Sequence, residues 1–223
     1  MLQQVFSDIG SGGKLFVETG AGDGSFASCR HLKASAGWNG MNVDASLSSS
    51  DDGFVETDMG SFDGFGDFLQ SQGTPKELDL LVLRTGNDFA LWVSASLADI
   101  RPRVVLATFH SGLGAEKALV ASELSSTDSL GQSGSTGPGC SLAAITWLAR
   151  QLEYLCVHVD RLGLYVVCID NTEAGRIAGA KEHWNNAVLL WRVMEFHPDT
   201  SNLPPRQWIS PEEWMVQQGL ALQ

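Results

Sequence analysis

Short apolar runs alternate with segments of helical periodicity along most of the chain. Between the apolar runs, residues 25–36, 63–72 and 88–98 have the apolar spacing of helices. Strands that alternate with helices form a parallel sheet covered by helices on both faces, so the pattern predicts an α/β fold of Rossmann-like type. The expected strands are residues 15–18, 39–44, 55–58, 78–83 and 104–109.

The second half of the chain predicts an antiparallel end to this sheet. Residues 141–153 form an amphipathic helical pattern, and two apolar runs follow at 155–159 and 164–169, joined by a polar turn. One more helix is expected at 181–194, before a tail that contains Trp and Pro. We therefore expect residues 1–170 to form one domain and residues 171–223 to pack on it as a C-terminal helix and tail.

Residues 122–139 differ from the rest because they are rich in Ser, Gly and Thr and poor in apolar side chains. Such a stretch inside a compact domain is typical of a surface loop or a lid over a site. The sequence predicts that this segment moves in the absence of substrate.

Charge and cysteine content narrow the class of protein. The net charge is −12 in 223 residues, and Lys and Arg do not cluster, which excludes a phosphate-tracking surface for nucleic acid. None of the four cysteines has zinc-ligand spacing, so no metal site is predicted, and buried free thiols indicate a reducing, cytoplasmic setting. No apolar run is long enough to span a membrane, and a targeting segment of a longer natural protein would be absent from this chain.

The first predicted strand ends in the stretch FVETGAGDGS, residues 16–25, where an acid is followed by three glycines at alternate positions. Glycines at the carboxyl end of a strand let the backbone approach a ligand closely. The second strand ends at Asp44, where a carboxylate can accept hydrogen bonds from ribose hydroxyls. Glycines with an acid about 20 residues further on are typical of a nucleotide-cofactor site.

Two cofactors compete for this pattern. A nicotinamide dinucleotide needs G-x-G-x-x-G/A, but Ser25 occupies the last position, and Glu18 and Asp23 would lie close to an anionic pyrophosphate. S-adenosylmethionine carries a sulfonium and an ammonium group, which nearby acids stabilise. The pattern E-x-G-x-G-x-G therefore favours S-adenosylmethionine. The alternative without a ligand is a glycine-rich turn that only lets a helix pack on a strand.

Several stretches in order resemble the FkbM-like branch of class I S-adenosylmethionine-dependent methyltransferases. They are QVFSDIGSGGKLFVETGAGDGS, GWNGMNVDAS, LDLLVLRTGNDFALWV, IRPRVVLATFHSGLGAEKAL and GCSLAAITWLARQLEYLCVHVDRLGLYVVCID. They span residues 4–170, about three quarters of the chain. Assigned members of this family methylate hydroxyl oxygens, often on sugars or secondary metabolites.

The resemblance implies roles for individual residues. Glu18, Gly20 and Gly22 would contact the methionine portion of the cofactor, with Asp23 in the same loop. Asp44 would bind the ribose, and Asp58 with Met59 would flank the adenine.

One position departs from the family. Relatives carry an acidic pair after the fourth strand, in a pattern like I-D-[IV]-[DE]-G-N-D, whereas this chain reads Leu-Arg-Thr-Gly-Asn-Asp at residues 83–88. Arg84 stands where the first acid is expected, and it would either pair with Asp88 or Asp44 or supply a counter-charge to an anionic acceptor. His110 and Asp88 are the candidate bases for a hydroxyl acceptor. The competing structural roles are a loop cap for His110 and a helix N-cap for Asp88.

Three functions remain open from the sequence. The first is an O-methyltransferase that acts on a small-molecule or glycan hydroxyl. The second is a protein that binds S-adenosylmethionine or S-adenosylhomocysteine without catalysis, which Arg84 keeps open. The third is an NAD-dependent oxidoreductase. Trp208 and Trp214 in the tail are expected to cover either the domain itself or a partner subunit, as in a homodimer.

Overall fold

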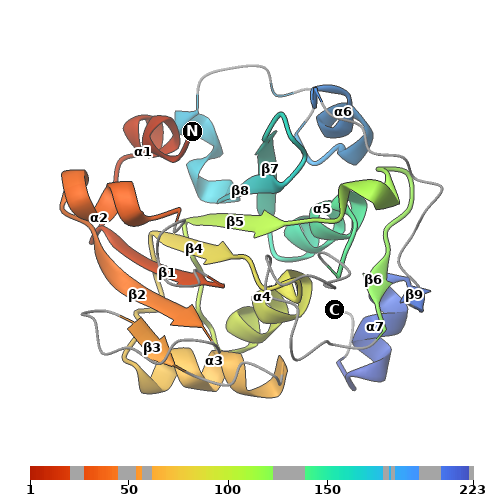
Figure 1. The fold of residues 1–223 in the computed structure, drawn as a ribbon, viewed down its shortest axis with the longest axis horizontal. Helices are drawn as coiled ribbons and strands as arrows, with labels where there is room; N and C mark the ends of the chain where they lie inside the picture. Colours follow the sequence, from red (N-terminus) through yellow and green to blue (C-terminus); the bar gives the residue numbers. More distant parts are fainter. Residues whose placement is uncertain are drawn as a thin grey trace.

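A seven-stranded sheet forms the centre of the molecule, in the order β3-β2-β1-β4-β5-β8-β7 (Figure 1). The computed structural model describes residues 1–20, 28–44, 54–56, 62–122, 139–177, 181, 184–195 and 207–220. The β8 strand runs antiparallel to both of its neighbours, whereas β1 to β5 pair in parallel. The strands are β1 (Leu15–Thr19), β2 (Asn39–Asp44), β3 (Phe54–Glu56), β4 (Leu80–Leu83), β5 (Val104–Thr108), β7 (Tyr154–Val159) and β8 (Tyr165–Asp170).

Helices cover both faces of this sheet, which confirms the predicted α/β class. Successive residues of β4 alternate between two buried clusters: Leu81 and Leu83 pack with α3, α4 and α5, and Leu80 and Val82 pack with α1 and α2. All four β4 side chains are fully buried, because the sheet is covered on both sides. The helices are α1 (Leu2–Ile9), α2 (Arg30–Ala36), α3 (Phe62–Ser71), α4 (Asp88–Leu97), α5 (Leu142–Gln151), α6 (Ala187–Arg192) and α7 (Pro211–Gln217), with short 3₁₀ turns η1 (Ser111–Leu113) and η2 (Asn171–Arg176).

The tail packs against the main body of the domain. The strand β9 (Trp208–Ile209) pairs antiparallel with β6 (Val120–Ala121), and this two-stranded sheet is separate from the central one (Figure 1). Trp214 of α7 is fully buried, with its ring edge-on to Phe89 of α4 at 5.3 Å. Trp214 therefore covers the core of its own chain.

The helices differ from the expectation in several details, and α1 was not predicted. The helix expected at 181–194 begins only at Ala187, because Asn185 adopts a left-handed backbone (φ 54°) and bonds the edge of β7. Its side chain accepts from the Cys156 N–H at 2.7 Å and donates to the Tyr154 carbonyl at 2.9 Å. The α7 helix was missed, although Ser210 and Glu213 form a capping box that the sequence displays.

A network of salt bridges joins the amino-terminal ends of β4 and β5 to η2. Arg103 donates to Asp79 at 2.9 Å and to Glu173 at 2.8 Å. Burial alone would raise the pKa of Asp79, but hydrogen bonds from the Gly12 N–H, Arg103 and the Leu15 N–H outweigh it and lower the pKa. Because the folded-state pKa is lowered, Asp79 stabilises the fold above its unfolded pKa and loses that effect as pH falls.

We therefore expect Asp79→Asn to lower the free energy of unfolding by about 2 kcal/mol near neutral pH, since charge-assisted bonds are lost. The difference from the native chain should begin to shrink as pH falls below about 4, where the unfolded carboxyl becomes protonated, and it should be lost below the lowered folded-state pKa, where the native carboxyl is protonated as well. Urea unfolding at several pH values measures this. A difference that does not change with pH would assign the loss to packing instead of charge.

No helix among the described residues is long and apolar enough to cross a bilayer.

Candidate functional site

The candidate site lies at the carboxyl ends of β1 and β4, where the strand order reverses direction. The connection from β1 leads to β2 on one side, and the later strands continue through β4 to β5 on the other. Ligands of open α/β sheets bind at this switch point. Figure 1 shows β1 between β2 and β4.

Gly20 closes the end of β1 against both neighbouring strands. Its N–H donates to the Val43 carbonyl of β2 at 3.0 Å, and its backbone is left-handed, with φ +67°. A Cβ on this residue would lie 2.5 Å from the Arg84 carbonyl oxygen. Gly20 is thus required by the close approach of the chain that follows β4.

Glu18 is fully buried, and three donors among the described residues hold its carboxylate. Oε1 accepts from the Ser28 N–H at 2.6 Å and Oε2 from the Cys29 N–H at 2.9 Å, at the start of α2. The third donor is Arg84, whose Nη1 lies 3.1 Å from Oε1. Burial raises the pKa of the Cys29 thiol, and the neighbouring Glu18 carboxylate raises it further.

Arg84 pairs with Glu18, a partner that the sequence did not suggest. Of the two partners that it did suggest, Asp88 accepts from Thr85 and Thr108, and the side chain of Asp44 lies outside the described residues. The pair joins β1 to the end of β4, and its side chains are 0% exposed for Glu18 and 12% exposed for Arg84. The guanidinium also lies over the ring of Tyr165 at the start of β8, 5.9 Å from its centroid. The cation at position 84 is therefore already countered inside the protein.

Asp88 is buried and joins the β4–α4 loop to the end of β5. Its Oδ1 accepts from the Thr85 N–H at 2.9 Å, and its Oδ2 accepts from the Thr108 N–H at 2.7 Å and the Thr108 hydroxyl at 2.5 Å. Asn87 is the N-cap of α4, so the alternative of Asp88 as an N-cap is wrong. Burial raises the pKa of Asp88, against the hydrogen bonds from Thr108 and Thr85 that lower it.

His110 follows β5 at the same rim and caps the turn η1. Its Nδ1 accepts from the Gly112 N–H at 3.1 Å, and its ring is edge-on to Trp208 at 6.2 Å. A ring nitrogen that accepts a backbone N–H leaves the proton of the neutral imidazole on Nε2. His110 therefore has the structural role that the sequence offered as the alternative to catalysis.

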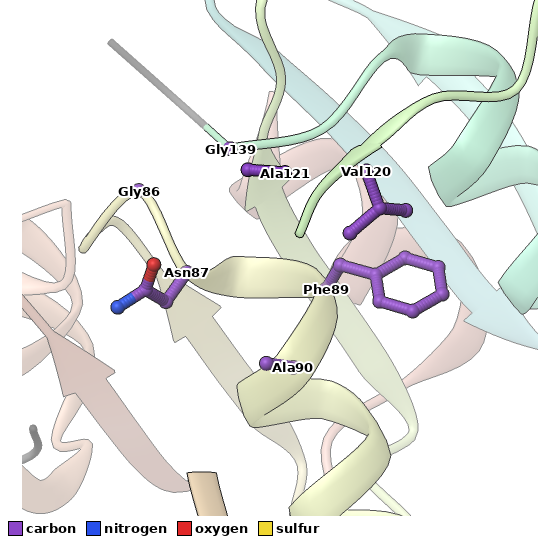
Figure 2. A pocket seen from close by; sticks show the side chains of 7 residues that line it. All are labelled: Gly86, Asn87, Phe89, Ala90, Val120, Ala121 and Gly139. Atoms are coloured by element: carbon purple, nitrogen blue, oxygen red, sulfur yellow. The ribbon is translucent and has the colours of Figure 1, made fainter. Parts of the chain in front are cut away.

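A small pocket lies beside these residues, between the β4–α4 loop and the two-stranded sheet (Figure 2). It has room for about one water molecule, about 10 Å³, so in this state it admits the end of a chemical group and not a whole ligand. The Gly139 N–H donates to the Gly86 carbonyl at 2.6 Å across its rim. The lining residues are Gly86, Asn87, Phe89, Ala90, Val120, Ala121 and Gly139.

Part of the predicted site falls outside the described residues. Gly22, Asp23, Asp58 and Met59 lie there, as does most of the predicted lid at 122–139. For Asp44 the structure describes the backbone: it is the last residue of β2, next to Val43, which pairs with Thr19 of β1. Asp44 therefore ends β2 at the same rim as Glu18 and Gly20.

Sequence reasoning missed Thr108 and Tyr165, which contact Asp88 and Arg84. Both residues end or begin a strand at the rim, and Thr108 pairs with Tyr165 across β5 and β8. A polar residue directly after the apolar run of β5 was the available signal for Thr108. Tyr165 had no signal, since it lies 81 residues after Arg84 and is brought close only by the antiparallel insertion of β8.

No protein-family model and no curated protein matches this chain.

Proposed function

We propose that this chain is an S-adenosylmethionine-dependent methyltransferase that acts on a hydroxyl of a small molecule or glycan. The observation that carries the proposal is the switch point between β1 and β4, because Glu18, Gly20 and the end of β2 at Asp44 all lie there. The helix α5 followed by the antiparallel strands β7 and β8 agrees with the terminal helix and hairpin that the resemblance implies.

The residues at this rim fit the chemistry of the cofactor. A buried carboxylate, Glu18, and the terminal aspartate of β2 lie on neighbouring strands, and both suit a ligand that carries cations and ribose hydroxyls. Bound there, S-adenosylmethionine would supply a methyl group already activated by its sulfonium. The protein's part is then to position the acceptor and exclude water, for which a general base is optional.

The same geometry disfavours a nicotinamide dinucleotide. A pyrophosphate needs the free N–H groups at the start of the helix after β1. Here the N–H groups of Ser28 and Cys29 already donate to Glu18. In addition, the sixth position of the sheet is taken by the antiparallel β8, whereas the dinucleotide-binding order continues in parallel.

A second candidate function is a binder of S-adenosylmethionine or S-adenosylhomocysteine that does not turn over. Asp88 and His110, the candidate bases from the sequence, are both engaged in structural hydrogen bonds. This observation favours the binder only if the acceptor needs a base. Product formation over a panel of neutral and carboxylated hydroxyl acceptors separates the two functions.

Asp44→Ala tests the cofactor. Two hydrogen bonds from ribose hydroxyls to a carboxylate are charge-assisted, at about 1.5–3 kcal/mol each. We expect the variant to weaken S-adenosylhomocysteine binding by at least about tenfold in calorimetry, since about 1.4 kcal/mol corresponds to tenfold. Unchanged affinity in a folded variant would remove Asp44 from the site, and no binding by the native chain would contradict the proposed function.

A further inference from the structure

We propose that Arg84 is an internal counter-ion of Glu18 that occupies the place of the cofactor's ammonium group, and that it must be displaced when the cofactor binds. The inference rests on the proposed function, because it concerns the methionine end of the same site. It makes Arg84 a residue that sets cofactor affinity.

Arg84 lies between Glu18 and the solvent. Glu18 has no exposed side-chain surface, while Arg84 is 12% exposed. A ligand at this rim therefore meets the guanidinium before it can reach the carboxylate. A buried carboxylate without a cation is strongly unfavourable, so a cation must stand beside Glu18 whether or not a ligand is present.

Backbone N–H groups, and not Arg84 alone, hold the Glu18 carboxylate in place. The helix-start N–H of Ser28 holds Glu18 Oε1 at 2.6 Å, whereas the Arg84 contact to the same oxygen is longer, at 3.1 Å. The backbone donors fix the carboxylate, and the guanidinium is the donor on a flexible side chain. Replacing it by an ammonium leaves the other contacts of Glu18 intact.

Tyr165 provides a second contact for the Arg84 guanidinium. The guanidinium already lies 5.9 Å from the centroid of the Tyr165 ring on β8, on the side away from β1. A displaced Arg84 keeps this cation–π contact while it gives up Glu18. Like charges repel, so an arginine that stays in place would oppose both cations of S-adenosylmethionine.

The test compares neutral and charged substitutions at position 84 by calorimetry. Arg84→Met removes the competing cation, and we expect it to bind S-adenosylhomocysteine at least tenfold more tightly than the native chain. Arg84→Lys keeps the charge and should bind within about threefold of native, a change of less than about 0.7 kcal/mol. Neither change should alter the affinity for 5′-methylthioadenosine, which lacks the ammonium and carboxylate.

Thermal unfolding gives a second readout. Without ligand, Arg84→Met should melt at a lower temperature than native, since Glu18 loses its counter-ion. Saturating S-adenosylhomocysteine should then raise the melting temperature of the variant by more than that of the native chain. If Arg84→Met does not fold, Arg84→Gln, which keeps a donor for Glu18, replaces it with the same expectation.

Arg101→Met is the matched control. Arg101 also pairs with a buried acid, Asp170, at 2.5 Å, and also lies over a tyrosine ring, 5.3 Å from the centroid of Tyr154. It lies at the opposite end of the sheet, so its loss should lower stability without changing ligand affinity.

The outcomes separate the two proposals. Equal or weaker binding of S-adenosylhomocysteine by Arg84→Met, with native binding intact, would overturn the displacement of Arg84. Failure of the native chain and of every variant to bind either ligand would overturn the proposed function itself.

Discussion

Gly20→Ala is expected to destabilise the protein by about 3 kcal/mol. A left-handed backbone costs an alanine about 1–2 kcal/mol, and forcing extra atoms into a packed position costs about 1–3 kcal/mol more. At Gly20 both costs apply, because φ is +67° and the new Cβ would lie 2.5 Å from the Arg84 carbonyl oxygen and 2.8 Å from its carbonyl carbon. Both contacts are to backbone, which cannot rotate away as a side chain can.

Gly73→Ala separates the two costs. Gly73 has nearly the same backbone, φ +71°, but no atom lies within 4 Å of its added Cβ. We expect it to lose only the conformational part, about 1 kcal/mol. Urea unfolding of the two variants measures the difference. Equal losses would show that the contact between Gly20 and Arg84 relaxes freely, and the rim of β1 and β4 would then be less rigid than the structure indicates.

An alanine at position 20 would also push against the backbone of Arg84. Moving its backbone would also disturb the Arg84 N–H bond to the Thr19 hydroxyl, at 3.2 Å, and the Arg84–Glu18 pair beyond it. Gly20 is thus needed in this structure to bring β1 and β4 together, whatever further contact it makes with a ligand.

The sheet was predictable because its strands are buried on both faces. Such strands read as unbroken apolar runs, as in β4 and β5, and the helices between them keep their own periodicity. The helix expected at residues 25–36 ends at Ala36 as predicted, just before Gly37, which is left-handed with φ 68°. The helix expected at 181–194 begins later than predicted because of a contact distant in sequence: the Asn185 side chain bonds the backbone of β7.

The partners within the site were not predictable from spacing. Glu18 and Arg84 are 66 residues apart and meet only because Glu18 pairs with Val82 in the register of β1 and β4. Arg84 is two residues beyond Val82, so it lies on the same face of the sheet as Glu18. The sequence singled out both residues, but the choice of partner needed the register.

Asp88→Asn is the second substitution that we expect to lower stability strongly. It also separates a structural role of Asp88 from a catalytic one. Both carboxylate oxygens accept from backbone N–H groups, Thr85 on one side and Thr108 on the other. An asparagine must turn its NH₂ group towards one of these donors. We therefore expect Asp88→Asn to lower the free energy of unfolding by about 3 kcal/mol, since a buried N–H loses its acceptor. A general base would instead give a stable but inactive variant.

The pH dependence of this loss gives a further test. Burial raises the pKa of Asp88, so the folded chain holds this proton more tightly than the unfolded chain does. Stability from this group is therefore present below its unfolded pKa, about 3.9, and falls as pH rises towards the raised folded value. The gap between native and Asp88→Asn should narrow as pH rises, whereas the gap for Asp79→Asn should widen. Asp99→Asn, at an exposed pair with Lys76, should change stability by less than about 0.5 kcal/mol. If Asp88→Asn is as stable as the native chain but has lost turnover, Asp88 acts as a catalytic base and the proposed structural role is wrong.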